Sequence, residues 1–379
     1  MWLLSLLSLL VWGFGLVSAL LGTLYALRQF AKKTASAPAA TRFPPISILK
    51  PLKGLEAGME QSLRTFFEQD YPEFEIIFCV ADPLDPTIRL VMGLMREYAH
   101  VPVRLHVGEA HAGPNPKVNN LIPGYEIARF DLALISDSNV RVWPTYLKAL
   151  AACLDDQVGV VTAVVAGRDA KGLGGKLEAA YLNTSVARWM WIAHAIKHPC
   201  VIGKTMLFRR STMNRFGGLR GLARYVAEDY TTGQAMNRLG LRTEVVSEPV
   251  AQFLGHYSFS TFWSRHLRWG RIRRSQSPPG FFMEPLQYAL GAGGFGAFGF
   301  WWLFEVPALA FLAMHFLIWG IADASLMRRL EGKLTLPMIG AWFLRELLAL
   351  PHWLHMCAGN KISWRGNRLR ILHGGLVEA

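Results

Sequence analysis

Four short stretches of the sequence place charged side chains where they could act on a charged substrate. Asp82 and the Asp137-Ser138-Asn139 step each follow an apolar run typical of a buried strand. Farther along, Glu228 and Asp229 are adjacent acids, and Arg265-His266-Leu267-Arg268-Trp269 is a basic and aromatic cluster. Carboxylates and cations at strand ends suit one reaction well, the transfer of a sugar from a nucleotide diphosphate, because they can orient the donor and balance its charge.

Each strand-end motif has a functional and an ordinary structural interpretation. Asp82 could accept hydrogen bonds from a uracil or ribose, or it could form the turn at Ala81-Asp82-Pro83, where aspartate is common. Asp137 could bind Mg²⁺ or Mn²⁺ at a diphosphate, since such ions prefer hard oxygen ligands and retained waters. Asn139 could add a neutral carbonyl oxygen, although Asp, Ser and Asn also favour a tight turn.

Asp229 is the residue that we expect to act as a general base, which requires its carboxylate to reach a substrate hydroxyl. One of the adjacent acids, Glu228 or Asp229, could instead cap the helix expected from Thr231 to Arg238. Lys117 begins another expected helix after a loop rich in Gly, Pro and Asn. A helix N-terminus that carries a lysine is a natural site for an anion.

The basic cluster is expected on a helix that begins at about Ser260. Arg265 and Arg268 are three residues apart and share one face, with Trp269 beside Arg265. Two guanidinium groups could clamp a diphosphate while the indole stacks on a sugar. A basic helix next to a membrane, touching lipid headgroups, has the same composition, and both roles can hold together.

The region from about Ile46 to Ser277 alternates short apolar runs with helical patterns. The expected strands are Ile46–Leu49, Glu75–Val80, Val103–Val107, Leu132–Ile135 and Gly159–Val165, and the expected helices between them are Met59–Glu68, Pro86–Tyr98 and Lys117–Ala128. This alternation predicts an α/β fold with a mostly parallel sheet. Ligands of such sheets bind beyond the carboxyl ends of the strands, where Asp82 and Asp137 would lie.

Composition excludes several classes of site and partner. Four cysteines show no CxxC spacing, so a zinc site is not expected. Cys200 could be a reactive thiol or an ordinary buried one. No P-loop, GxSxG or HExxH motif is present.

The net charge of +13 fits a partner that is nucleic acid, anionic lipid or a phosphate-bearing substrate. The apolar segments at both ends of the chain favour lipid and phosphate over nucleic acid.

The first 27 residues carry no charged side chain. About 20 apolar residues suffice to cross a bilayer. The positive charges Arg28, Lys32 and Lys33 follow the apolar run rather than precede it, which favours a retained anchor over a cleaved signal peptide. The positive-inside rule then places the N-terminus outside and the catalytic region in the cytoplasm, so we expect an integral membrane protein.

The C-terminal third is also apolar. Leu286 to Ile321 is almost uncharged and is expected to form two helices broken at Pro307. The stretch Leu336–Cys357 carries Arg345-Glu346, a costly pair at mid-span, and is expected to be interfacial or re-entrant. We therefore expect an N-terminal anchor at 1–30, an Ala/Pro linker at 35–45, a catalytic domain at 45–277, membrane segments at 284–358 and a basic cytoplasmic tail at 359–379.

Taken together, Asp82, Asp137, Asp229 and Arg265-x-x-Arg268-Trp269 resemble the three-aspartate and (Q/R)xxRW signature of the ceramide glucosyltransferases, glycosyltransferase family 21. The resemblance runs from about residue 45 to the C-terminus. The matching segments are Leu49–Gly54, Asn115–Glu126, Ala227–Tyr230, Ala341–Glu346 and Ile362–Arg365. Each motif is weak alone, but their order and spacing are specific.

The resemblance implies a GT-A catalytic domain facing the cytosol, UDP-glucose as donor, ceramide as acceptor, and inversion to a β-glucoside. By position, it implies that Asp82 contacts the uridine, that Asp137 contacts Mg²⁺ or Mn²⁺ and the diphosphate, and that Asp229 is the base. Lys117 and Glu228 are expected to bind substrate beside them. Many GT-A enzymes have a second carboxylate where this chain has Asn139, so the metal assignment rests on Asp137.

For the basic cluster, the resemblance implies that Arg265, Arg268 and Trp269 hold the donor pyrophosphate and the acceptor. A related lipid glycosyltransferase, such as a hopanoid N-acetylglucosaminyltransferase, shares the aspartates and a similar cluster and is the alternative. A processive polysaccharide synthase is disfavoured because Arg265 replaces the usual Gln and few spans are available. A silent membrane scaffold would not need Asp82, Asp137, Asp229 and Arg268 together. No feature of the sequence indicates an oligomeric state.

Overall fold

The computed structural model describes residues 1–32, 43–364 and 366–378 and divides the chain into two compact units. The helical unit comprises Met1–Phe30, Ala166–Ile192 and Leu254–Gly374, and the sheet unit comprises Ala31–Val165, Ala193–Phe253 and Gly375–Ala379. The chain therefore passes between the units several times. The Ala/Pro linker expected at 35–45 falls mostly outside the described residues.

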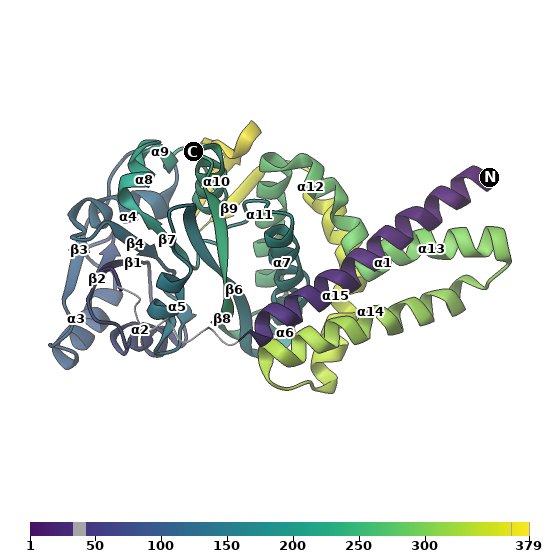
Figure 1. Ribbon diagram of the computed structural model, residues 1–379, viewed down its shortest axis with the longest axis horizontal. Helices are drawn as coiled ribbons and strands as arrows, with labels where there is room; N and C mark the ends of the chain where they lie inside the picture. Colours follow the sequence, from purple (N-terminus) through teal and green to yellow (C-terminus); the bar gives the residue numbers. More distant parts are fainter. Residues whose placement is uncertain (33–42, 365, 379) are drawn as a thin grey trace. The chain divides into compact units, whose positions relative to one another are not determined.

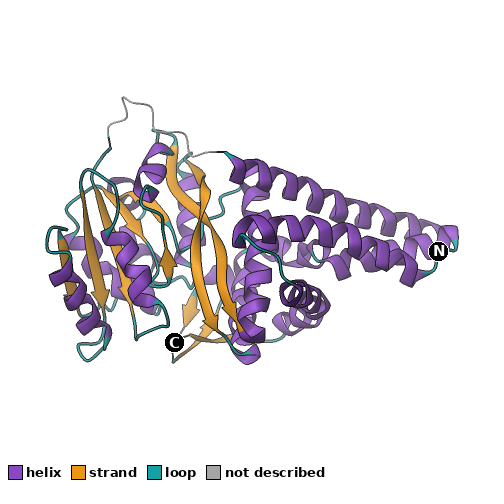
Figure 2. Cartoon of the chain, turned by 90° about the horizontal axis from the view of Figure 1, so that it is seen from below, coloured by secondary structure: helices purple, strands orange, loops and turns teal. Residues whose placement is uncertain are grey.

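The sheet unit is built on a mixed sheet with the strand order β3-β2-β1-β4-β7-β6-β8-β5 (Figure 2). Its strands are β1 (Ile46–Leu52), β2 (Phe74–Val80), β3 (Val103–Val107), β4 (Leu132–Ile135), β5 (Val140–Arg141), β6 (Val158–Lys171), β7 (Met206–Arg209) and β8 (Arg242–His256), the last residues of β6 and β8 belonging to the helical unit. Strands β3, β2, β1 and β4 are parallel, as expected.

The sheet is less parallel than the sequence predicted. Strand β7 runs antiparallel to β4, β6 runs antiparallel to β7, and β5 runs antiparallel to β8. In the β4–β7 pair, Met206 lies opposite Ile135. The start of β7 therefore lies at the carboxyl end of β4. The loop that precedes β7 and the loop that follows β4 thus meet at the same end of these two strands.

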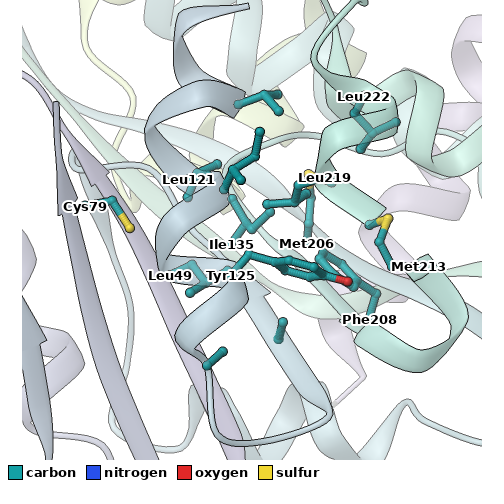
Figure 3. Packing of buried hydrophobic residues seen from close by; sticks show 14 of the residues in the cluster. Leu49, Cys79, Leu121, Tyr125, Ile135, Met206, Phe208, Met213, Leu219 and Leu222 are labelled. Atoms are coloured by element: carbon teal, nitrogen blue, oxygen red, sulfur yellow. The ribbon is translucent and has the colours of Figure 1, made fainter. Parts of the chain in front are cut away.

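Helix α4 (Pro116–Ile127) shows how the core of this unit is formed. Its apolar residues Val118, Leu121, Ile122 and Tyr125 recur at helical spacing, so they lie on one face, and all four are buried. Figure 3 shows this face against side chains from β1, β2, β4 and β7 and from α9 (Gly218–Leu222). The other helices are α2 (Met59–Phe67), α3 (Thr87–Glu97), α5 (Tyr146–Ala152), α8 (Arg210–Asn214) and α10 (Glu228–Arg238).

The helical unit contains the long apolar helices (Figure 1). These are α1 (Trp2–Ala31), α13 (Ala289–Phe304), α14 (Ala308–Glu331) and α15 (Leu336–Cys357), together with α6 (Gly172–Tyr181), the π-helix η1 (Leu182–Val186), most of α7 (Ala187–Ala195), α11 (Phe259–Gln276), α12 (Pro278–Met283) and the 3-10 helix η2 (Glu284–Gln287). Among the described residues, α1 and α14 are long and apolar enough to cross a membrane, judged by length and composition.

The break predicted at Pro307 is confirmed. Helix α13 ends at Phe304, Glu305 adopts the left-handed conformation with a φ of 57°, and α14 starts at Ala308. Helix α1 packs against the resulting hairpin, since the indole N–H of Trp12 donates to His315 Nδ1 over 3.2 Å. Figure 1 shows α1 running beside α13 and α14. Three apolar helices thus form one bundle.

Buried ion pairs connect the helices of this unit. The guanidinium of Arg188 on α7 pairs with Asp323 on α14, and both side chains are almost fully buried. Asp323 also accepts the indole N–H of Trp342 over 2.7 Å, and Arg188 donates to Thr23 over 3.1 Å. One polar contact set therefore joins α1, α7, α14 and α15.

The charged pair Arg345-Glu346, which led us to expect an interfacial or re-entrant segment, lies inside the continuous helix α15. Arg345 donates to Ser185 on η1 over 2.8 Å, and Glu346 accepts the backbone N–H of Ala289 over 2.7 Å. Beyond α15, the basic tail forms an antiparallel pair of strands, β9 (Lys361–Trp364) and β10 (Asn367–Ile371), and the chain continues to η3 (His373–Gly375) and β11 (Val377–Glu378).

Candidate active site

The residues after β4 form the centre of a charged cluster in the sheet unit. Asp137 Oδ1 lies 2.8 Å from Lys117 Nζ, and its Oδ2 lies 3.4 Å from Lys204 Nζ. Lys50 donates to the backbone carbonyl of Asp137 over 2.6 Å. The sequence predicted Asp137 and Lys117 as site residues but missed Lys50 and Lys204.

Lys50 is a fully buried cation inside strand β1. Its ammonium also contacts Ser136 Oγ at 3.3 Å and lies 3.6 Å from the centre of the Phe66 ring. Burial lowers the pKa of Lys50 well below its usual value. A lysine in an otherwise apolar strand was the available signal, because lysine is rarely buried without a partner.

The start of α4 fixes Lys117. The side chain of Asn115 accepts the backbone N–H groups of Lys117 and Val118 at 3.0 and 3.1 Å, and Pro116 occupies the first helical position. Besides Asp137, the Lys117 ammonium lies 2.7 Å from Glu228 Oε1. Lys117 therefore bridges carboxylates from two distant parts of the sequence.

Glu228 and Asp229 form the first turn of α10. The sequence had suggested instead that both acids precede this helix. Residue Ala227 occupies the capping position, with no side-chain cap. Asp229 Oδ2 accepts the backbone N–H of Gly203 over 2.8 Å, and Oδ1 accepts that of Tyr230 over 2.8 Å. The Asp229 carboxylate is thus held on both oxygens, beside a glycine that the sequence did not indicate.

The pKa values of Asp137 and Asp229 are shifted in opposite directions. Burial alone would raise the pKa of Asp137, but Lys117 and Lys204 outweigh it and hold that pKa well below its usual range. Burial and then the neighbouring Glu228 raise the pKa of Asp229 to about 6, with Lys117 opposing. Asp137 therefore stays ionised, whereas Asp229 is poised to take up a proton near neutral pH.

These geometric observations agree with what comparison of the sequence finds. A model of glycosyl transferase family 21 matches residues 14–377. The chain belongs to this family.

Curated relatives support the assignment to family 21. Ceramide glucosyltransferase 3 of Caenorhabditis elegans is 28% identical over 359 residues, covering 93% of this chain and 77% of the relative. The ceramide glucosyltransferase of Komagataella phaffii is 28% identical over 448 aligned positions, covering 94% of this chain and 88% of the relative.

A solved structure shows the fold. The mannosyltransferase PcManGT from Pyrobaculum calidifontis, in complex with GDP-Man and Mn²⁺, has a TM-score of 0.56 and 18% sequence identity, with 93% of this chain and 97% of that chain covered. The family 21 chain therefore has the GT-A glycosyltransferase fold expected from its sequence.

Not all the predicted site residues of this family 21 chain join the cluster. Asp82 follows β2, is exposed, and accepts the backbone N–H of Leu84 over 2.9 Å, which is the local turn considered above. Asp85, which the sequence did not single out, accepts the Gly54 N–H over 2.7 Å and so ties the loop after β1 to the start of α3. Burial raises the pKa of Cys200 to about 12, so this thiol is protonated at neutral pH.

The basic cluster lies on α11, in the helical unit, where Trp269 lies beside Arg265 as predicted. The Arg265 guanidinium lies 4.6 Å from the Trp269 ring and 3.2 Å from the buried carboxylate of Glu178. His266 Nε2 lies 2.6 Å from the other Glu178 oxygen. Arg268 stacks over Trp364 at 5.5 Å. Glu178 thus anchors this helix from α6.

The protein ligands available for a divalent cation are few. Among the described residues, no group of three or more His, Cys, Asp and Glu side chains is arranged to hold a metal. Magnesium commonly binds through one or two carboxylates and completes its shell with water and substrate phosphates. The ionised Asp137 at the end of β4 fits that pattern, and Asn139 adds no charge.

Proposed function

We propose that this protein transfers glucose from UDP-glucose to the primary hydroxyl of ceramide with inversion, giving β-glucosylceramide. The observation that carries the proposal is the match to family 21 over residues 14–377, together with relatives named ceramide glucosyltransferase that align over 93% and 94% of the chain. Asp137 and Asp229 are the proposed carriers of the chemistry that such a transfer requires.

Asp229 is the proposed general base. As the acceptor oxygen bonds to the anomeric carbon, the hydroxyl proton passes to the Asp229 carboxylate. The bond between the anomeric carbon and the phosphate oxygen breaks on the opposite face, and UDP leaves with the electron pair. The backbone N–H groups of Gly203 and Tyr230 hold the carboxylate in place during this transfer.

Charge on the departing diphosphate must be balanced as that bond breaks. Lys117 is the proposed residue for this role, because its ammonium is fixed by α4 between Asp137 and Glu228. Asp137 would hold Mg²⁺ or Mn²⁺, which when bound would neutralise further phosphate charge. Glu228 would act by positioning Lys117 and by raising the proton affinity of Asp229.

Other predicted contacts remain proposals that rest on the family resemblance. Asp82 is proposed to bind the uridine, and Arg265, Arg268 and Trp269 to serve the donor pyrophosphate and the acceptor. The Arg268→Ala variant tests the basic cluster: weaker UDP binding is expected, and unchanged affinity would assign α11 to lipid contact alone.

We also propose that the protein is anchored in a membrane with its catalytic region in the cytoplasm. Helix α1, with 30 residues, and α14, with 24 residues, are each long and apolar enough to cross a bilayer. Arg28 and Lys32 follow the apolar part of α1, which is the side that the positive-inside rule assigns to the cytoplasm. Such helices would keep the enzyme beside a lipid acceptor.

The decisive experiment supplies membranes containing the protein with labelled UDP-glucose or UDP-GlcNAc and with either ceramide or a hopanoid. Thin-layer chromatography of the products then identifies donor and acceptor together. Labelled glucosylceramide is expected, and it should be absent with the Asp229→Asn variant. Label found only in a hopanoid product would establish the alternative lipid glycosyltransferase.

A further inference from the structure

Lys204 is a cation that the family signature does not include but that the fold brings to the Asp137 cluster. It precedes β7, and because Met206 pairs with Ile135, the residue lies beside the loop that follows β4. Its ammonium lies 2.7 Å from Asn139 Oδ1 and 3.4 Å from Asp137 Oδ2. Lys204 thus reaches both strand-end residues that the sequence analysis associated with a diphosphate.

The backbone around Lys204 is held firmly. The Ile202 N–H donates to Thr162 Oγ1 over 3.2 Å, and the Thr205 N–H donates to the Ile202 carbonyl over 3.1 Å. The hydroxyl groups of Thr205 and Tyr146 lie 2.9 Å apart in the core. A turn fixed to β6 on one side and to α5 on the other presents the ammonium in a defined place.

Asn139 gives Lys204 a partner without neutralising it. The amide oxygen accepts a hydrogen bond but carries no formal charge, and Asp137, a carboxylate that Lys204 also contacts, is shared with Lys117. An aspartate at position 139 would instead form an ion pair with Lys204. The Asn139 amide therefore holds the Lys204 ammonium without adding negative charge at the carboxyl end of β4, where Asp137 keeps 28% of its side chain exposed.

We propose that Lys204 binds the diphosphate of the sugar donor, with Asn139 as the residue that positions its ammonium. The inference rests on the proposed function, since it takes the donor to be a nucleoside diphosphate sugar. A fixed ammonium is a strong partner for phosphate oxygens. Lys204 would share with Lys117 the negative charge that grows on the leaving group.

The test measures binding of UDP, UMP and uridine to the full-length protein in detergent, with a chelator present so that no metal contributes charge. Lys204→Met is expected to weaken UDP binding by about 10- to 100-fold, because a hydrogen bond to a charged group is lost. Binding of uridine, which lacks phosphates, should be unchanged. Lys204→Arg should retain most of the UDP affinity.

Two further variants separate a binding role from a structural one. Lys148→Met removes a lysine from a surface pair with Asp70 in the same unit and should leave UDP affinity unchanged. Asn139→Asp should weaken UDP binding in the chelator while Lys204 is still present. Unchanged UDP affinity in Lys204→Met, or an equal loss of UDP and uridine binding, would overturn the proposal.

Glucosylceramide synthesis, measured on the same protein preparations, distinguishes a failure of the proposed reaction from a failure of the proposed role of Lys204. Wild-type protein that binds UDP through Lys204 but makes no glucosylceramide would refute the proposed reaction and leave Lys204 as a diphosphate-binding residue. Glucosylceramide synthesis together with unchanged UDP affinity in Lys204→Met would instead refute the role of Lys204 alone.

Discussion

The backbone N–H of Gly203 donates to Oδ2 of Asp229 over 2.8 Å, so a residue without a side chain sets the position of the proposed base. A Cβ at position 203 would lie 3.0 Å from Lys117 Nζ and 3.2 Å from Asp229 Oδ2. Both contacts are tighter than a side chain normally tolerates, and the crowded atoms are those that the proposed reaction would use.

Gly203→Ala should therefore impair catalysis more than folding. We expect turnover to fall about 10- to 100-fold, because small displacements of reacting groups are costly, while the thermal midpoint changes little. Gly93→Ala in α3 is the matched control, since a Cβ there meets nothing within 4 Å. That control should keep full activity and gain about 0.5–1 kcal/mol of stability. Normal turnover in Gly203→Ala would contradict the tight placement of Asp229.

Asp229→Asn should separate catalysis from binding. The amide oxygen can still accept a backbone N–H, but the amide cannot take the acceptor's proton. Turnover should fall by roughly 10²- to 10⁴-fold, while the affinity for UDP-glucose, measured by calorimetry, stays near the wild-type value. Asp155→Asn, at an exposed pair with Arg242, serves as the control. Near-normal activity would remove Asp229 as the base.

The pH profile should report the raised pKa of Asp229. The proposed base would work only when ionised, and burial together with the neighbouring Glu228 raises the pKa of Asp229 to about 6. Activity should thus be present above pH 6 and fall about tenfold per pH unit below it. Glu228→Gln removes a charge that raises this pKa, so the acid limb of kcat/KM should move to lower pH. A shift to higher pH would show that another group controls the limb.

The buried pair of Arg188 and Asp323 should behave differently in single and double variants. Asp323→Leu leaves a buried guanidinium without its carboxylate and should cost about 3–5 kcal/mol, whereas adding Arg188→Met should recover much of that loss. Thermal unfolding in detergent measures both. Arg242→Met at the protein surface should cost under about 1 kcal/mol. Equal losses in the single and double variants would mean that the pair itself stabilises the unit.

Much of the fold was predictable because local signals were strong. Strands β1, β2 and β4 were located within a few residues by their apolar runs, and Pro307 marked the break between α13 and α14. The antiparallel placement of β7 was not predictable, because it depends on pairing with β4 across some 70 residues of chain. No local pattern encodes such a pairing.

The same reasoning explains which site residues were missed. Asp137, Lys117 and Asp229 lie at strand or helix ends, where sequence patterns locate them. Lys204 and Gly203 belong to the turn before β7, so their place in the cluster follows from the strand pairing that the sequence did not show. Tertiary contacts thus brought into the cluster the two residues that local patterns could not indicate.

The position of Lys117 links the binding of the diphosphate to the proton affinity of Asp229. Its ammonium lowers the proton affinity of Asp229, while Glu228 raises it. A diphosphate that neutralises Lys117 would therefore make Asp229 more basic. By thermodynamic reciprocity, UDP should bind with uptake of a proton and more tightly as the pH falls toward 6. The donor would thus make Asp229 a stronger base at a pH above its raised pKa, where the carboxylate is still ionised.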